Sequence, residues 1–391
     1  MKKNDFNFKM LDPENCAMCG MCTNYCPTYM ISKNESESPR GRISIIEGLN
    51  KGDLKPTTAA LKHLNSCTMC LACESICPAQ VNFYDLMVQA RDKYFHKQKI
   101  IFKIKSSLIS ILFSNNIFRI FIKKIFFIIK KTRLDEAKYE IFKNLQYIES
   151  KNKKKINFKT YEAKKKVIGI FTGCATDIFQ ENVGRDCIDI LNRNNINAEI
   201  LKNIKCCGSL DFHNGRKRIG LRNYHDTVSK FNTIKYRKII GYASGCSAFL
   251  MSNKNYEDAT SYILNVLSMN NANFKPSDLN VCIHKPCTTK LANINFENLI
   301  QTLKMVPKIS VSIFEDRYCC GAGAQNLLHN KNNSLEIIYP KINFIKKNNI
   351  DIVLTYNIGC SLNFINAINL NNIDNVKVMH PISFFNDKQI I

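Results

Sequence analysis

Two stretches of the chain decide its fold: CAMCGMCTNYCP at residues 16–27 and CTMCLACESICP at residues 67–78. Each stretch repeats the spacing C-x2-C-x2-C-x3-C and ends in proline. The first quartet consists of Cys16, Cys19, Cys22 and Cys26, and the second of Cys67, Cys70, Cys73 and Cys77. This spacing is typical of proteins that bind two 4Fe-4S clusters, because three closely spaced thiolates can converge on one face of a cluster. The sequence therefore predicts two iron-sulfur clusters.

The fourth cysteine of each quartet is expected to bind the cluster of the other quartet. Pro27 and Pro78 stop the local helix, so the preceding cysteine points away from its own cluster. The predicted ligand sets are Cys16, Cys19, Cys22 and Cys77 for one cluster, and Cys67, Cys70, Cys73 and Cys26 for the other. This crossing holds the two centres close enough for electron transfer. The alternative is a pair of zinc sites, but zinc sites use two separated C-x2-C pairs rather than unbroken quartets.

Length, cysteine content and the amino-terminal sequence bound the class of protein. A chain of 391 residues is long enough for two or three domains. The start, MKKNDFNFKMLDPEN, has no apolar signal region, so we expect reduced cysteines in the cytoplasm rather than a disulfide scaffold. The sequence contains no run of about twenty apolar residues, so it predicts no helix that crosses a membrane.

The positive charge is concentrated in one segment. The formal net charge is +24, and residues 91–166 contain 22 lysines and arginines against 6 acidic residues. Within this region, residues 100–133 combine apolar and basic positions, which predicts two basic amphipathic helices at a membrane surface. The alternative is that these helices pack against the next domain with their lysines in water. The lysine clusters at 151–155 and 164–166 predict a solvated linker. Because the positive charge of the chain is concentrated on an apolar segment, the sequence disfavours a nucleic-acid-binding protein.

The segment between the quartets predicts a helix with two arginines near its start. Ser38-Pro39-Arg40-Gly41-Arg42 precedes apolar residues at helical spacing, from Ile43 to Leu49. Arg40 and Arg42 would lie beside the clusters and raise their reduction potentials, since cations favour the reduced cluster. The alternative is a solvated arginine pair that caps the helix.

An internal repeat follows from residue 166 onward. Short apolar runs predict strands at 167–171, 198–201, 238–243, 281–284, 311–314 and 352–356. Cysteines follow these strands in the same order twice, as Cys174, Cys206, Cys207 and Cys246 and then as Cys287, Cys319, Cys320 and Cys360. We predict a thiolate-lined site in each repeat, with His284 as an additional ligand or proton carrier in the second. Four thiolates suit zinc or a further iron-sulfur cluster, and buried structural cysteines are the alternative. Cys187 and Cys282 lie outside the pattern and are expected to be merely buried.

These observations predict an α+β multidomain protein. The expected domains are an α-helical ferredoxin domain with two 4Fe-4S clusters (1–98), a basic amphipathic connector (99–165), and two repeated α/β Cys-Cys-Gly domains (166–275 and 276–391).

The chain resembles the iron-sulfur subunits of bacterial glycolate oxidase, also called glycolate dehydrogenase. The resemblance rests on the two quartets, Ser38-Pro39-Arg40-Gly41-Arg42, the two Cys-Cys-Gly units, Ala243-Ser244-Gly245-Cys246 and Asn357-Ile358-Gly359-Cys360. It extends to the iron-sulfur subunits of anaerobic glycerol-3-phosphate dehydrogenase, of lactate utilisation and of heterodisulfide reductase. In the last group the motif ends in C-x2-C and binds an unusual cluster, whereas Phe249 and Asn363 stand at the corresponding positions here.

The resemblance implies a subunit that relays electrons. FAD-containing partner subunits would oxidise glycolate to glyoxylate, and this chain would pass the electrons towards membrane quinone from the inner face of the cytoplasmic membrane. The chain has no G-x-G-x-x-G fingerprint, which fits a flavin on another subunit. The alternatives are a glycerol-3-phosphate or lactate dehydrogenase subunit, or a thiol/disulfide redox subunit of the heterodisulfide reductase type.

Overall fold

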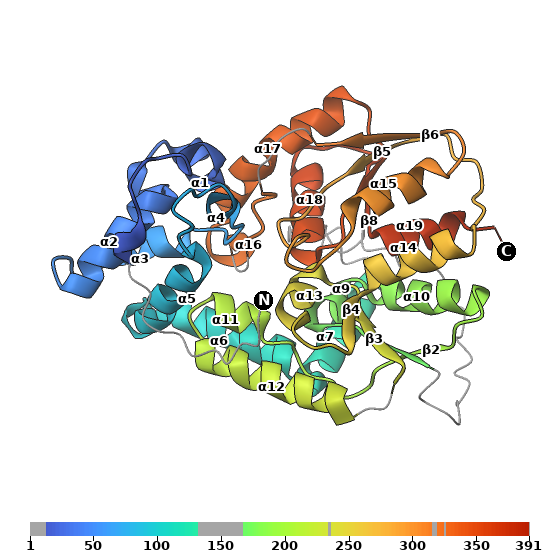
Figure 1. Cartoon of the computed structure of the whole chain (residues 1–391), viewed down its shortest axis with the longest axis horizontal. Helices are drawn as coiled ribbons and strands as arrows, with labels where there is room; N and C mark the ends of the chain where they lie inside the picture. Colours follow the sequence, from blue (N-terminus) through green and yellow to red (C-terminus); the bar gives the residue numbers. More distant parts are fainter. Residues whose placement is uncertain (1–12, 132–166, 234–235, 315–318, 324–325, 391) are drawn as a thin grey trace. The chain divides into compact units, whose positions relative to one another are not determined.

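A computed structural model describes residues 13–131, 167–233, 236–314, 319–323 and 326–390 (Figure 1). The chain divides into two compact units, each assembled from separate segments. Unit 1 comprises Met1–Ile111, Gly208–Arg222 and Glu315–Lys341, and unit 2 comprises Leu112–Cys207, Asn223–Phe314 and Ile342–Ile391. The predicted lysine-rich linker at 151–155 and 164–166 lies outside the described residues. The bounds of the four domains expected from the sequence stay predictions.

Unit 1 is built from short helices and loops around the two cysteine quartets. In chain order the first elements are η1 (Pro13–Asn15), η2 (Thr23–Tyr25), α1 (Pro27–Ser32), η3 (Glu35–Glu37), α2 (Pro39–Lys51), α3 (Thr58–Asn65), α4 (Ala72–Ser75), α5 (Phe83–Lys93) and η4 (Phe95–Lys97). Later segments of the chain add α11 (Ser209–His213) and α16 (Asn326–His329). Apolar side chains of α2, α3 and α5 form its core together with Cys67 and Cys73. The expected helical domain around the quartets is thus confirmed.

Helix α2 begins earlier than its apolar spacing suggests. Ser38 is the N-cap, and its Oγ accepts a hydrogen bond from the backbone N–H of Gly41. Pro39 follows in the first turn, where its missing N–H removes no helical hydrogen bond. Arg40 and Arg42 therefore belong to the helix rather than to a loop before it.

Unit 2 contains two parallel sheets with the same strand order. The first sheet runs β2-β1-β3-β4 and the second β6-β5-β7-β8. Their strands are β1 (Ile168–Phe171), β2 (Ala198–Ile200), β3 (Lys238–Gly241), β4 (Tyr256–Asp258), β5 (Leu279–Ile283), β6 (Ile309–Ile313), β7 (Ile352–Leu354) and β8 (Lys377–Met379). The identical order confirms the internal repeat. The edge strands β4 and β8 were not expected from the sequence, because their residues, Tyr-Glu-Asp and Lys-Val-Met, do not form an apolar run.

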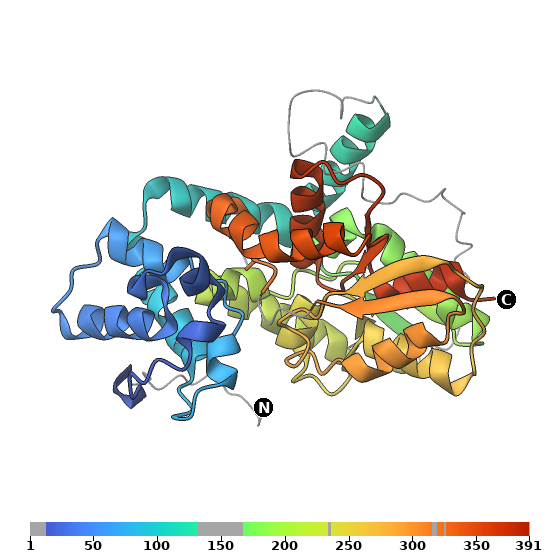
Figure 2. The ribbon, with the colours of Figure 1, turned by 90° about the horizontal axis from the view of Figure 1, so that it is seen from above.

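Helices pack against the two sheets of unit 2 and join their cores. They are α9 (Cys174–Phe179), α10 (Glu181–Arg193), α13 (Ser244–Leu250), α14 (Ala259–Met269), α15 (Phe296–Lys304), α18 (Ile358–Leu370) and α19 (Pro381–Lys388). Helices α10, α14 and α19 pack together (Figure 1), and Figure 2 shows β5 and β6 side by side above α15. One continuous apolar core runs through both repeats, so the two repeats stabilise each other.

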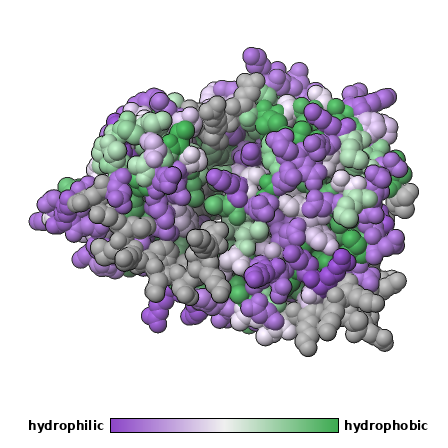
Figure 3. Space-filling view, viewed as in Figure 1, coloured by the Kyte–Doolittle hydropathy of each residue, from purple (hydrophilic) through white to green (hydrophobic). Residues whose placement is uncertain are grey.

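Three further helices begin in one unit and end in the other: α6 (Ile100–Ser114), α12 (Lys217–Thr233) and α17 (Lys331–Lys347). Helix α7 (Asn116–Lys131) follows α6 and belongs to unit 2. Among the described residues no single helix is long and apolar enough to cross a membrane, and α6 with the first part of α7 would reach that length only as a bent pair. On the face shown in Figure 3, hydrophilic residues are in the majority and hydrophobic residues form patches between them.

Candidate metal centres

The two quartets of unit 1 adopt the same backbone pattern. The second residue after the first cysteine has a positive φ in both loops, at Met18 (52°) and Met69 (53°). The residue after the second cysteine does the same, at Gly20 (80°) and Leu71 (60°). Such angles are unfavourable for residues other than glycine and persist where the surroundings impose them, often at binding sites. Both loops therefore curl in the same way around their cysteines.

The fourth cysteine of each quartet lies at a break in the helical structure. Cys26 ends η2 and is the N-cap of α1, whose first residue is Pro27. Pro27 thus begins a helix, where the sequence suggested only that it ends one. Pro78 lies in a turn after α4. In both loops the fourth cysteine is separated from the first three by a change of backbone direction.

Burial distinguishes the two predicted ligand sets. Cys26, Cys67 and Cys73 are buried, whereas Cys16, Cys22 and Cys77 are half-buried and Cys19 is exposed. Burial raises the pKa of the Cys22 thiol to about 11, with smaller contributions from Cys16 and Cys26. Burial also raises the pKa of Cys73 well above its usual value, and the neighbouring thiols Cys70, Cys67 and Cys26 add to this. Clustered thiols with raised pKa values fit a metal cluster, because bound cations stabilise the thiolate forms.

A buried ion-pair network supports the set that contains Cys26. The guanidinium of Arg42 is fully buried, and its Nη2 lies 2.6 Å from Glu37 Oε2 and 3.0 Å from Ser66 Oγ. Its Nη1 donates to the backbone oxygen of Glu37 and lies 3.8 Å from Cys26 Sγ. Burial alone would lower the pKa of Arg42, but Cys67, Cys26 and Glu37 raise it. His63 Nδ1 completes the network at 2.6 Å from Glu37 Oε1.

The two arginines of α2 have different surroundings. Arg40 is half-exposed, pairs with Glu35 Oε1 at 2.6 Å and donates to the Met18 backbone oxygen at 3.0 Å. Arg42 lies beside Cys26 among the buried groups. Both arginines therefore lie near cysteines, because the backbone N–H of Arg40 donates a hydrogen bond to Cys22.

Sequence reasoning missed a second buried arginine. Arg91 of α5 donates to the backbone oxygens of Leu64 and Cys67, both at 2.8 Å through Nη2, and to that of His213 at 2.9 Å through Nη1. Burial lowers its pKa to about 10. Arg91 therefore positions the start of the second quartet. The only sequence signal is a charged residue at a core position of an amphipathic helix.

The first Cys-Cys-Gly repeat brings its four predicted cysteines together within unit 2. Cys174 begins α9 directly after β1, and its Sγ lies 3.3 Å from Cys206 Sγ. The Cys207 thiol is hydrogen-bonded with Cys206 and Cys246. These hydrogen bonds and burial raise the pKa values of Cys174 and Cys207 well above the usual range, and Arg119 acts in the opposite direction on Cys174. Four thiols at this spacing suit a tetrahedral sulfur site.

The cysteines of the second repeat belong to different units. Cys287 is exposed and Cys360 is buried, both in unit 2. His284 is also buried there, with Nδ1 3.1 Å from Thr355 Oγ1 and its ring against Phe364. Cys319 and Cys320 belong to unit 1. The four-thiolate site of this repeat stays a prediction.

Within unit 1 the second Cys-Cys-Gly loop packs against the second quartet. Asn326 Nδ2 donates to the Ser66 backbone oxygen at 3.1 Å, and Gly323 is so close to Thr68 that a side chain would collide with its Cα. Cys319 is near enough to Cys70 to raise the pKa of that thiol, after burial. Sequence alone does not reveal this contact, since about 250 residues separate the loops.

The glycines of both Cys-Cys-Gly units have the conformation that the motif predicts. Gly208 and Gly321 have φ values of 88° and 82°. A Cβ at Gly208 would collide with the backbone oxygen of Gly220, and one at Gly321 with that of Ser334. Glycine is therefore required after each cysteine pair. Cys187 and Cys282, which lie outside the pattern, are fully buried in unit 2 as expected.

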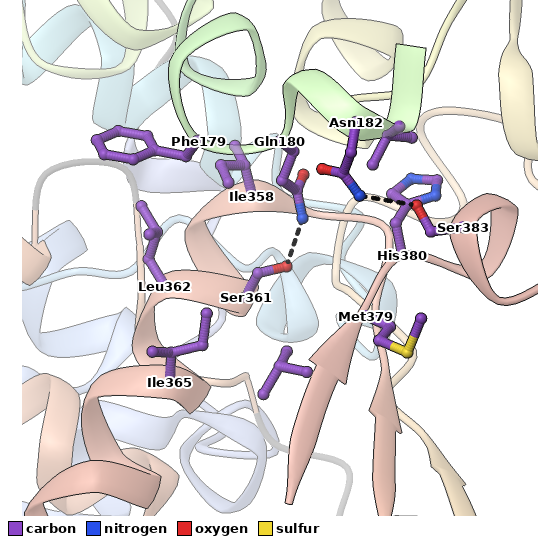
Figure 4. A pocket seen from close by; sticks show the side chains of 12 residues that line it. Phe179, Gln180, Asn182, Ile358, Ser361, Leu362, Ile365, Met379, His380 and Ser383 are labelled. Carbon is purple, nitrogen blue, oxygen red and sulfur yellow. Dashed lines mark hydrogen bonds between the residues drawn. The ribbon is translucent and has the colours of Figure 1, made fainter. Parts of the chain in front are cut away.

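A small pocket of unit 2 lies between the two repeats (Figure 4). Gln180 Nε2 donates to Ser361 Oγ at 3.2 Å, and Asn182 Nδ2 donates to Ser383 Oγ at 3.3 Å. Burial lowers the pKa of the lining residue His380 to about 3, so its ring is neutral at pH 7. The cavity of about 30 Å³ accommodates water rather than an organic substrate.

Comparisons with known proteins agree with this architecture. The 4Fe-4S dicluster domain matches residues 12–81, and the cysteine-rich domain matches residues 168–251 and 281–365. The glycolate oxidase iron-sulfur subunit of Escherichia coli is 24% identical over 90% of this chain and 89% of its own length. The probable glycolate oxidase iron-sulfur subunit of Bacillus subtilis is 24% identical over 92% of this chain and 90% of its own length. Lactate utilization protein A of Shouchella clausii is 22% identical over 57% of this chain and 99% of its own length.

The matched domains cover more than half of the chain, and the quartets, the repeated sheets and the paired cysteines lie within them. The chain therefore belongs to the iron-sulfur proteins that join a 4Fe-4S dicluster domain to two cysteine-rich domains, the family that includes the glycolate oxidase iron-sulfur subunits.

Proposed function

We propose that this chain is the iron-sulfur electron-transfer subunit of a flavin-dependent 2-hydroxy-acid dehydrogenase, with glycolate as the substrate of FAD-containing partner subunits. The observation that carries the proposal is the pair of quartet loops with one backbone pattern, in a chain similar to the glycolate oxidase subunits over nearly its whole length. Iron-sulfur clusters accept and donate single electrons, which suits a relay between a flavin and a membrane quinone.

The proposed ligand sets remain the crossed ones. Cys16, Cys19, Cys22 and Cys77 would hold one 4Fe-4S cluster, and Cys67, Cys70, Cys73 and Cys26 the other. The influence of Cys26 on the pKa of Cys73, together with its place beside Arg42, supports its inclusion in the second set. Arg42 and Arg91 would favour extra negative charge at this set, because both guanidinium groups are buried beside it.

The first repeat is proposed as a third metal centre. Cys174, Cys206, Cys207 and Cys246 would hold a further iron-sulfur cluster, with zinc as the alternative. Burial and mutual hydrogen bonds raise the pKa values of Cys174 and Cys207, so without a metal these thiols are poor nucleophiles. This argues against thiol/disulfide chemistry at the site, and a bound metal would stabilise the thiolates.

The proposal is tested by reduction with substrate. The chain is purified anaerobically with the subunits that accompany it, and the complex is mixed with glycolate, lactate or glycerol 3-phosphate. We expect glycolate to reduce the clusters, seen as new EPR signals. Reduction by lactate or glycerol 3-phosphate alone would reassign the substrate, and a loaded complex that no 2-hydroxy acid or polyol phosphate reduces would contradict the proposal.

A further inference from the structure

Helix α6 exposes a stripe of apolar side chains and buries two serines on its opposite side. Ile100, Ile101, Ile104, Leu108 and Ile111 are exposed, with Ile101 at 63% and Leu108 at 54%. At 100° per residue these positions form one stripe, which we call the outer face of α6. On the opposite side, Ser106 and Ser110 are buried. This is the reverse of the usual arrangement of a surface helix.

Polar contacts within unit 1 fix this orientation. Ser110 Oγ donates to Asp211 Oδ2 at 2.8 Å, and Ser106 Oγ lies 3.4 Å from His329 Nε2. Arg216 Nη1 donates to the backbone oxygen of Ser106 at 2.8 Å. Rotating the helix to bury the isoleucines would break these hydrogen bonds, and the Asp211 carboxylate would lose the hydrogen bond that Ser110 donates.

Helix α7 shows the same reversal within unit 2. Ile117, Phe118, Ile120, Phe121 and Ile125 are exposed and form the outer face of α7. Two of its cations point inward: Lys123 Nζ lies 2.7 Å from Asp177 Oδ1, and the buried Arg119 donates to the Ile204 backbone oxygen at 3.2 Å. Two helices thus expose ten large apolar side chains. On each helix the exposed side chains form their own contiguous apolar stripe, and such a surface marks a binding site for a protein or a membrane.

Composition favours a lipid surface over a protein partner. Residues 93–134 contain eleven lysines and arginines and no acidic residue, and α6 and α7 contain no tryptophan or tyrosine. Cores of protein interfaces are depleted in lysine and enriched in aromatic residues, methionine and arginine. Lysine beside isoleucine, leucine and phenylalanine is typical of helices that lie on anionic membranes. Lys105 and Lys124 are exposed and would reach lipid headgroups.

We propose that the outer faces of α6 and α7 bind the surface of an anionic membrane. Helix α6 has 15 residues, so at 1.5 Å per residue it is about 22 Å long, shorter than the hydrocarbon core. Each helix therefore lies in the interface with its outer face among the acyl chains. The exposed apolar side chains argue against the alternative, in which these helices pack against the next domain with their lysines in water.

The test is flotation of the full chain with lipid vesicles. Vesicles of phosphatidylcholine alone are compared with vesicles that also contain phosphatidylglycerol, without substrate or reductant. The test variant combines Ile104→Gln and Leu108→Gln, and the matched control combines Leu54→Gln and Met269→Gln, which are exposed elsewhere. Iron content and melting temperature of all proteins confirm that the variants fold.

We expect the wild-type protein and the control to bind phosphatidylglycerol vesicles, and the test variant to bind at least about tenfold more weakly. Lys105→Gln with Lys124→Gln should weaken binding to the anionic vesicles only. Equal binding of the test variant and the wild type, or no binding of the wild type, would overturn the proposal. Loss of the co-purifying subunits from the test variant with unchanged vesicle binding would instead assign the surface to a protein. Reduction by hydroxy acids is measured without vesicles, so the two proposals fail independently.

Discussion

The two cysteine quartets of unit 1 share a loop conformation and differ in their surroundings. The first quartet has the exposed Cys19 and the half-exposed Arg40, which donates to the Met18 backbone oxygen and also lies near Cys22. The second begins at the buried Cys67, whose backbone oxygen accepts a hydrogen bond from the buried Arg91. Cys26, although it belongs to the first quartet in sequence, lies with Arg42 among buried groups.

The difference shows that spacing alone determines the loop, while the rest of the unit determines its environment. Electrostatic interactions are stronger in a buried, low-dielectric site than at the surface. Charge substitutions at the second quartet should therefore have larger effects than matched substitutions at the first.

The largest expected effect is the loss of one cluster when its fourth ligand is removed. In Cys26→Ala the cluster of Cys67, Cys70 and Cys73 should be lost, while the cluster of Cys16, Cys19 and Cys22 remains. Cys77→Ala is the matched variant and should do the opposite. EPR spectra of the reduced proteins and their iron contents measure this. If each variant loses the cluster of its own quartet, the crossed assignment is wrong.

Arg42→Gln should destabilise the protein by about 3–5 kcal/mol. The variant leaves the buried Glu37 carboxylate without its guanidinium partner, and an unpaired buried charge is costly. Denaturant unfolding under anaerobic conditions gives the free energy. A change below about 1 kcal/mol would show that the network around Glu37 does not stabilise unit 1.

Acid should destabilise unit 1 through His213. Tyr84 Oη lies 2.8 Å from its Nε2, and burial, with a further contribution from Arg91, lowers its pKa from 6.5 to about 4. Because the folded protein resists protonation more than the unfolded chain, stability is constant above about pH 6.5 and falls as the pH drops towards 4. The loss is at most about 3 kcal/mol. His213→Gln should remove this part of the pH dependence of unfolding, and an unchanged profile would assign it to other groups.

The smallest expected effect is that of Arg40→Gln, the control for Arg42. Its ion pair with Glu35 is partly exposed, so the loss should be below about 1 kcal/mol. Denaturant unfolding in the same buffer checks this value. A loss equal to that of Arg42→Gln would remove the distinction between the two quartets.

The sequence predicts the repeat well because strands, cysteine intervals and glycines recur in one order. Alternation and apolar runs locate six of the eight strands, and the intervals from Cys174 to Cys206 and from Cys287 to Cys319 match. The sequence order of these features therefore predicts the repeat, although it does not tell which residues are in contact. The strands β4 and β8 could not be found, because charged residues interrupt them and each depends on the neighbouring strand of its sheet.

Long-range polar contacts escaped the sequence reasoning. The Glu37 carboxylate pairs with Arg42, which is near in sequence. It also accepts hydrogen bonds from His63 and Ser66, which are more than twenty residues away. The basic, apolar pattern around Arg119 predicts a surface helix, yet the Arg119 side chain is buried near Cys174. Periodicity describes which face is apolar and not which polar groups meet across the fold.

Metal and sulfide analysis of the anaerobically purified full chain tests the central claim most directly. The account predicts iron and acid-labile sulfide for at least two 4Fe-4S clusters per chain, and more iron if the first repeat also binds a cluster. Iron for two clusters together with zinc would limit the redox centres to the quartets. Zinc without iron and sulfide would contradict the claim that this chain carries electrons.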